Sequence, residues 1–197
     1  MNNLQVRELL LQSLEHERGG VLIYKAAIAA AQRPDLRAEW TQYLEQTEQH
    51  VESLTEICEA FDCDPFLMTP GRQIVKANGA ALLNAIEMAR AAGDPKAAQL
   101  VAAECIVLAE TKDHMDWELI GEVAKGLSGE QRELVSAAYE RIEDEEDEHL
   151  YHTQGWAREL WMDSLGLPAE LPPPEEKENV MTAAEAQQAK EMREPAH

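Results

Sequence analysis

The sequence is poor in aromatic and basic residues. Aromatic side chains make up 5% of the 197 residues, and 17 Lys and Arg stand against 38 Asp and Glu, which gives a formal net charge of −21. Such an acidic chain repels the phosphates of nucleic acids and anionic membrane surfaces, whereas it attracts cations and basic partners. We therefore expect no binding to nucleic acid or to membranes.

Long uncharged apolar runs are also missing. No stretch approaches the roughly 18 apolar residues of a membrane-spanning helix. Near the N-terminus, Arg7 and Glu8 interrupt the apolar segment that a signal peptide needs. The three cysteines, Cys58, Cys63 and Cys105, lack CxxC spacing, so we expect reduced thiols. These absences favour a cytoplasmic protein.

The remaining sequence, rich in Ala, Leu, Glu and Gln, predicts helices that Pro, Gly and Asp interrupt. The predicted helices cover residues 4–31, 34–61, 72–92, 95–126 and 128–165. Ser128 and Gln131 predict a capping box at the start of the last helix. Short connections make the first two helices and the last two antiparallel neighbours, with the shorter helix as a crossover between the pairs. The predicted fold is an all-α antiparallel four-helix bundle with a short crossover helix.

The composition changes near residue 167. The remaining segment, LPAELPPPEEKENVMTAAEAQQAKEMREPAH, contains three consecutive prolines, which favour an extended chain over a helix. We therefore divide the chain into a helical bundle of residues 1–166 and an acidic, Pro-rich tail of residues 167–197 that serves as a linker or an arm.

Acidic residues lie on the side of the long helices that should face the core. At about 100° per residue, the apolar stripes are centred on Glu17, Asp113 and Glu146 in the first, fourth and fifth helices. His149 follows Glu146 by three residues, so both side chains reach the same ion, and His50 takes the corresponding side position on the second helix. Because a buried, unpaired carboxylate is costly, their convergence from several helices indicates a bound cation.

Three further acids are weaker candidates for metal ligands. Glu110 and Asp116 flank the centre of the stripe on the fourth helix, and Glu48 lies about 100° from the centre of the stripe on the second. Carboxylate oxygens combined with imidazole nitrogens suit Fe, Mn or Zn better than Ca.

Over residues 4–165 this pattern resembles the ferritin-like superfamily, the di-iron carboxylate bundles that include bacterioferritins and rubrerythrins. Members carry a Glu on each of two helices and a Glu-x-x-His motif on each of the other two. The segment EDEH, residues 146–149, matches that motif, and Glu17 in LEHERGGVLIY resembles the ligand of the first helix. Asp113 or Asp116, in ETKDHMDWEL, would be its counterpart in the second hairpin. The segment TEQH departs from the motif, because Thr47 stands where the family has Glu.

The resemblance implies a dinuclear iron site, or a mixed Fe/Mn pair, that reacts with dioxygen or peroxide in the handling of iron or oxidative stress, with Zn as a further alternative. The expected metal ligands are Glu17, His50, Asp113, Glu146 and His149. Thr47 leaves one metal position short of a ligand, so a single-metal site and a vestigial site in a non-catalytic helical scaffold stay open. Iron storage in a closed shell is less favoured because of the crossover helix and the tail. We also expect a homodimer or another homo-oligomer.

Overall fold

The computed structural model describes residues 1–176, which contain five helices and no strand. The helices are α1 (Asn3–Ala30), α2 (Pro34–Ala60), α3 (Pro70–Ala91), α4 (Pro95–Lys125) and α5 (Gly129–Ser164). The prediction of an all-α fold is confirmed, and every predicted helix end lies within two residues of the observed one. None of these five helices combines the length and the apolar character that a membrane-spanning segment requires.

Prolines and capping side chains explain where the helices begin. Pro34, Pro70 and Pro95 each occupy the first turn of a helix, where the missing N–H would have had no partner within the helix. The side chain of Thr69 accepts a hydrogen bond from the backbone N–H of Arg72 and so caps α3. Local chemistry therefore sets these helix starts without help from the rest of the fold.

The predicted capping box at the start of α5 is wrong. Ser128 makes no side-chain hydrogen bond to the helix. Gln131 instead donates from Nε2 to the backbone oxygen of Ala60 at 2.8 Å. This side chain ties the start of α5 to the end of α2, so a tertiary contact has taken the place of the local cap.

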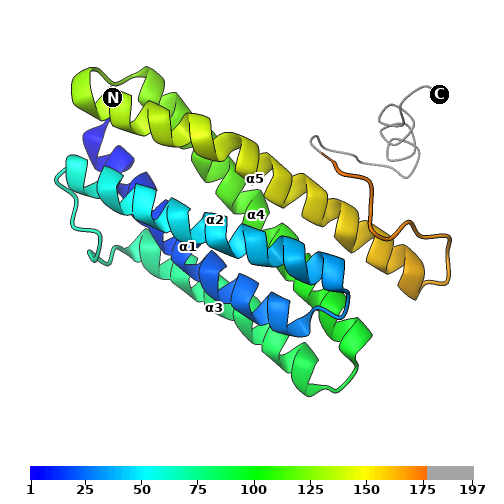
Figure 1. The fold of residues 1–197 in the computed structure, drawn as a ribbon. Coiled ribbons are helices and arrows are strands. Elements are labelled where there is room, and N and C mark those ends of the chain that lie inside the picture. Colours follow the sequence, from blue (N-terminus) through cyan, green and yellow to red (C-terminus); the bar gives the residue numbers. More distant parts are fainter. Residues whose placement is uncertain (177–197) are drawn as a thin grey trace, which may run out of the picture.

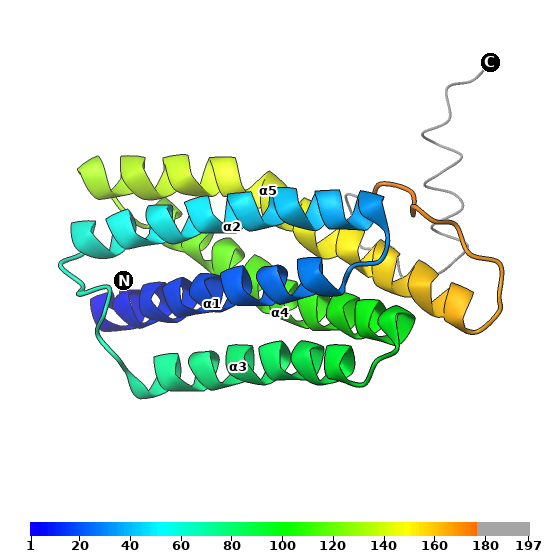
Figure 2. The same ribbon diagram turned by 60° about the horizontal axis from the view of Figure 1, so that its bottom comes forward.

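The long helices form two antiparallel hairpins, α1 with α2 and α4 with α5 (Figure 1). Because α3 returns the chain along the bundle, α2 and α4 run in the same direction (Figure 2). The helix α3 packs against α1 and α4, on the side of the molecule away from α5. This arrangement surrounds the middle of the bundle with α1, α2, α4 and α5.

Two apolar clusters fill the bundle, one toward each end. One cluster contains Trp40 and Trp156, and the other contains Leu14 and Trp117. The polar residues described below lie between them. Cys58, Cys63 and Cys105 are buried free thiols, as predicted.

The first residues of the tail pack against α5. The backbone N–H of Glu170 donates to Glu159 at 2.8 Å, and the carboxylate of the buried residue Glu176 lies 2.6 Å from the guanidinium of Arg158. Residues 177–197 lie outside the described part of the chain. The interpretation of the whole tail as a linker or an arm therefore stays a prediction.

Glycines lie at two helix contacts with different amounts of space. A Cβ atom at Gly79 of α3 would lie 3.7 Å from the Cα atom of Gly19 in α1, which is ordinary van der Waals contact. A Cβ atom at Gly121 of α4 would lie 2.6 Å from the ring of Tyr139 in α5, so the ring would have to move. Alanine at position 121 would therefore displace the ring of Tyr139, whereas the α1–α3 contact tolerates alanine.

We expect Gly79→Ala to raise the free energy of unfolding by up to about 1 kcal/mol, because alanine favours a helix over glycine by about that amount. Gly121→Ala gains the same helix propensity but overpacks its contact, so we expect a net loss of about 1–2 kcal/mol. Urea denaturation of the metal-free proteins measures both effects. Equal effects of the two replacements would contradict the difference in packing.

Candidate metal centre

The middle of the bundle holds carboxylates and histidines from all four long helices. Each side chain occupies the inward face of a helix that is otherwise apolar there, so helix packing carries it into the core. Buried at 4% exposure or less are Glu17 of α1, His50 of α2, Glu110 and Asp113 of α4, and Glu146 and His149 of α5.

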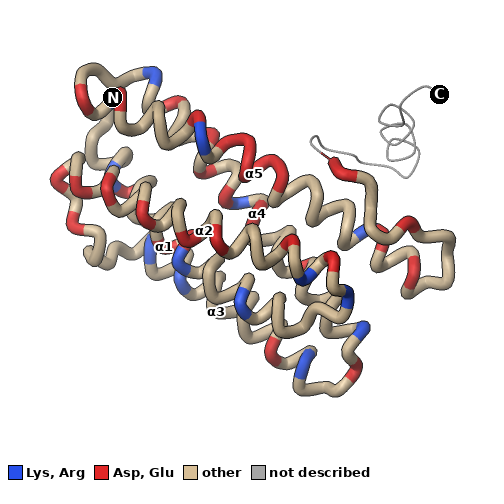
Figure 3. Tube along the Cα trace, viewed as in Figure 1, with Lys and Arg blue, Asp and Glu red and all other residues tan. Residues whose placement is uncertain are grey.

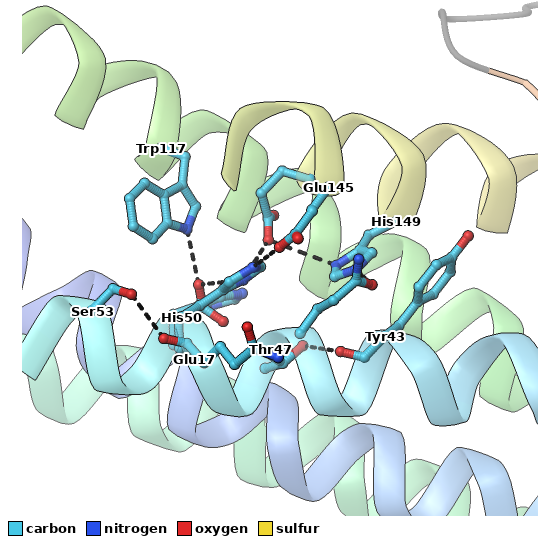
Figure 4. A network of polar contacts seen from close by, with 12 residues as sticks. Glu17, Tyr43, Thr47, His50, Ser53, Trp117, Glu145 and His149 are labelled. Carbon is cyan, nitrogen blue, oxygen red and sulfur yellow. Dashed lines mark hydrogen bonds and ion pairs between the residues drawn. The ribbon is translucent and has the colours of Figure 1, made fainter. Parts of the chain in front are cut away.

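The first group of potential ligands consists of Glu17, His50 and Glu146. The Nδ1 atom of His50 lies 3.3 Å from Oε1 of Glu17 and 3.1 Å from Oε1 of Glu146. The Nε1–H of Trp117 donates to the same oxygen of Glu17 at 2.9 Å, as Figure 4 shows, and so fixes that carboxylate. Three helices thus place one ligand atom each within 4.8 Å of the others.

The second group consists of Glu110, Glu146 and His149. The Nδ1 atom of His149 lies 3.7 Å from Oε2 of Glu110 and 3.7 Å from Oε1 of Glu146. Its ligand atoms also lie within 4.8 Å of one another. Glu146 belongs to both groups, so the structure presents two adjacent positions that share one carboxylate.

The two histidines are oriented by reciprocal hydrogen bonds. The Nε2 atom of His50 lies 2.8 Å from Oε2 of Glu145, and Nε2 of His149 lies 3.0 Å from Oε1 of Gln46. Both partner atoms only accept, so each Nε2 carries the donated hydrogen and each Nδ1 faces the centre. Gln46 precedes His50 by four residues, and Glu145 precedes His149 by four, so each helix orients the histidine of the other. Figure 4 shows Glu145 of α5 beside His50 of α2.

Many polar atoms at the centre have no hydrogen-bond partner among residues 1–176. Leaving a buried polar atom unpaired costs about 1–3 kcal/mol, and more when the group is charged. A cation that accepts lone pairs from these atoms would satisfy them together, so the residues fit a metal. The unpaired atoms are Oε2 of Glu17, Nδ1 of His50, Oε2 of Glu110, Oδ1 of Asp113, both carboxylate oxygens of Glu146 and Nδ1 of His149.

Burial and mutual repulsion shift the pKa values of these groups. Burial raises the pKa of Glu146 to about 7, and burial together with the charges of Glu17 and Glu146 raises the pKa of Asp113 well above its ordinary value. Burial acts to lower the pKa of His50, but the surrounding carboxylates raise it well above the ordinary histidine value. Protons therefore neutralise the centre when no metal is bound, and a metal ion must displace them.

The structure shows which of the weaker ligand candidates lie at the centre and which do not. Glu110, which the sequence ranks below Asp113, belongs to the second group, whereas Asp113 is buried beside both groups without belonging to either. Asp116 lies 2.6 Å from Nζ of Lys112 and is neutralised there. Glu48 points away from the centre, with its side chain 51% exposed and paired with a lysine on α1. Glu48 and Asp116 are thus placed outside the two groups.

The sequence pattern ranks Asp113 above Glu110, and the structure buries both. An apolar stripe indicates which residues of α4 face inward, but the choice of ligand among them depends on side-chain distances to other helices, which the pattern does not contain. The pattern also misses Gln46 and Glu145, which orient the histidines. A signal for them exists: aligning QTEQH (46–50) with EEDEH (145–149) places both residues four positions before a histidine.

Thr47 contributes no ligand atom to either group. Its hydroxyl donates to the backbone oxygen of Tyr43 at 2.8 Å, and its methyl group lies beside Gly20, whose Cβ would be 3.4 Å away. Gly20 therefore lies at a contact between α1 and α2. The helix α2 supplies His50 alone to the centre.

Comparisons of the chain with family models, with curated proteins and with solved structures gave no match. The ferritin-like resemblance thus depends on the residues and their arrangement alone.

The raised pKa of Glu146 predicts a pH dependence for the metal-free protein. Above about pH 4.5 the unfolded chain ionises this carboxyl, while the folded chain keeps the proton up to about pH 7, so stability falls as the pH rises through this range. We expect metal-free Glu146→Gln to lose less stability between about pH 5 and about pH 8, and to exceed the wild type by about 2 kcal/mol at the upper end.

Urea denaturation in the presence of a chelator measures this difference. Glu48→Gln, at an exposed position on α2, is the matched control and should follow the wild type. If the stability of Glu146→Gln changed with pH as that of the wild type does, folding would not raise the pKa of Glu146.

Proposed function

We propose that the middle of the bundle binds two metal ions that share the carboxylate of Glu146. One observation carries the proposal: Glu146 belongs to both groups of ligand atoms, and neither of its oxygens has a hydrogen-bond partner among residues 1–176. Glu17 and His50 complete the position on one side, and Glu110 and His149 complete the other.

We propose iron as the metal, either as two Fe(II) ions or as a mixed Fe/Mn pair, with Zn as the alternative. The potential ligand atoms are carboxylate oxygens and imidazole nitrogens, a set that suits these ions. No cysteine belongs to either group in the described residues, so the centre lacks the soft ligands of iron–sulfur sites.

We further propose that Asp113 replaces the carboxylate that Thr47 removes. A complete centre of the ferritin-like kind has four carboxylates, and their four negative charges balance the four positive charges of two divalent ions. Here α2 provides no carboxylate, but α4 provides a second buried one, Asp113, beside Glu17 and Glu146. The total charge of the centre is thereby restored from a different helix.

The proposed activity is the reaction of the centre with dioxygen or peroxide, in the handling of iron or oxidative stress. When bound, two ferrous ions supply electrons and open coordination positions for that reaction. The protein contributes geometry: Gln46 and Glu145 orient the histidines, and Trp117 fixes Glu17. The apolar clusters on either side limit the access of water. The arrangement of two antiparallel hairpins supports a ferritin-like protein, and we propose a homo-oligomer as its assembled form.

A second candidate function is a helical scaffold with a single-metal or vestigial site. Thr47 favours this alternative, because its hydroxyl is already hydrogen-bonded within α2 and cannot replace a carboxylate. The two proposals differ in the number of metal ions that each chain binds.

Metal content tests both proposals. After anaerobic loading with Fe(II), we expect about two ions per wild-type chain. Glu17→Ala and Glu110→Ala should each retain about one ion, and Glu146→Ala should retain close to none, because it removes the shared ligand. Elemental analysis of the desalted proteins measures these values. Glu48→Ala, which changes an exposed carboxylate, should bind as the wild type does.

Two results would support the alternatives, a single-metal site or a scaffold without metal. A wild type with one ion, lost in only one of the two single-group variants, identifies a single-metal site. A wild type with no ion, whose Tm ignores added metal, identifies the scaffold. Equal metal content in the wild type and all three ligand variants would remove the proposed centre.

The role of Asp113 has its own test, with Asp116 as the control three residues away. We expect Asp113→Asn to weaken metal affinity about tenfold or more, because it removes a buried negative charge beside the ions. Asp116→Asn should change affinity far less, because Lys112 already neutralises that carboxylate. Competition against a chromophoric chelator, with Co(II) as the probe, measures both. Equal affinities of the two variants would contradict the role of Asp113.

A further inference from the structure

A cavity of about 210 Å³ opens between α4 and α5 beside the proposed centre. Its inner wall includes Glu146 and Trp117. Glu146 is 1% exposed, and neither of its carboxylate oxygens has a hydrogen-bond partner among residues 1–176. The cavity thus leads from the surface to the residue that the two ligand groups share, and the carboxylate oxygens of that residue are buried behind the cavity wall.

Glu146 is the one residue of the two ligand groups that lines the cavity, and it belongs to both groups. None of Glu17, His50, Glu110 and His149 lines it. Trp117, which also lines the cavity, donates its Nε1–H to Glu17. An ion that arrives through this cavity therefore meets Glu146 before the other four residues.

The outer part of the cavity is acidic. Glu118, Glu143 and Asp147 line it, and none of its lining residues in the described chain is Lys or Arg. His114 lies 2.7 Å from Asp147, and the hydroxyl of Tyr139 donates to Glu143, so these contacts hold two of the three carboxylates in place. Figure 3 shows the run of acidic residues along the middle of α5 to which two of them belong.

The charge of the lining selects what enters. Carboxylates in a concave site focus the electrostatic potential, raise the local concentration of cations and repel anions. A divalent cation is attracted twice as strongly as a monovalent one in the same potential. The lining therefore suits a metal ion, whereas it opposes an anionic substrate.

We propose that this cavity is the entrance through which divalent metal ions reach the centre, with Glu118, Glu143 and Asp147 as a transient cation site at its mouth. The proposal rests on the proposed dinuclear centre and adds to it a route, in which an arriving ion first meets Glu146, the residue shared by the two groups. The three acids at the mouth act on the rate of loading, since they belong to neither ligand group.

Stopped-flow mixing of the metal-free protein with Co(II) tests the entrance, with Co(II) absorption as the signal. In the variant Glu118→Gln/Glu143→Gln/Asp147→Asn, we expect the second-order rate of loading to fall about tenfold at low ionic strength. The final metal content, measured by elemental analysis, should equal that of the wild type. Added salt should slow the wild type toward the rate of the variant, because it screens the attraction.

The matched control is Glu52→Gln/Glu56→Gln/Glu59→Gln, which removes the same number of charges from exposed positions on α2. It should load within about twofold of the wild type, because surface charges remote from the mouth act only through a screened field. Equal rates in the two triple variants would overturn the entrance while leaving the centre intact. A wild type that binds no Co(II) would overturn both, and the metal content alone separates these outcomes.

Discussion

Four carboxylates lie together in the dry middle of this bundle, and they cannot all carry their charge there without positive charge beside them. Glu17, Glu110, Asp113 and Glu146 are each buried to 4% exposure or less. In a medium of low dielectric constant their mutual repulsion is strong, so either protons or metal ions must neutralise them. The raised pKa of Glu146 and the unpaired oxygens are both consequences of this one constraint.

The rest of the bundle offsets the energetic cost of such a centre. Apolar clusters on both sides supply the burial that offsets its cost, and α3 covers α1 and α4 on the side away from α5. The face between α4 and α5 stays open as an acidic cavity. The helix α2 carries Thr47 and provides no carboxylate to the centre, whereas α4 carries two buried acids there, Glu110 and Asp113.

Periodicity predicted which acids and histidines face the middle of the bundle. Glu17, His50, Glu146 and His149 follow from the apolar stripes of α1, α2 and α5, and all four belong to the groups of potential ligands. On α4, periodicity placed Glu110, Asp113 and Asp116 on or beside the inward stripe, and all three are buried, but the choice among them as ligands needed the distances between helices. The capping box of α5 failed for a related reason, because its glutamine bonds to the end of α2.

The sequence by itself determined the five helices, their ends and the acidic character of the chain. These follow from local causes: proline geometry, capping side chains and the spacing of apolar residues. Only the tertiary structure decided that Glu146 belongs to both ligand groups, that each histidine is oriented from the opposite helix, and that a cavity between α4 and α5 lies beside Glu146. The rotation and axial shift of one helix against another depend on how side chains interlock across their contact, and no single helix contains that information.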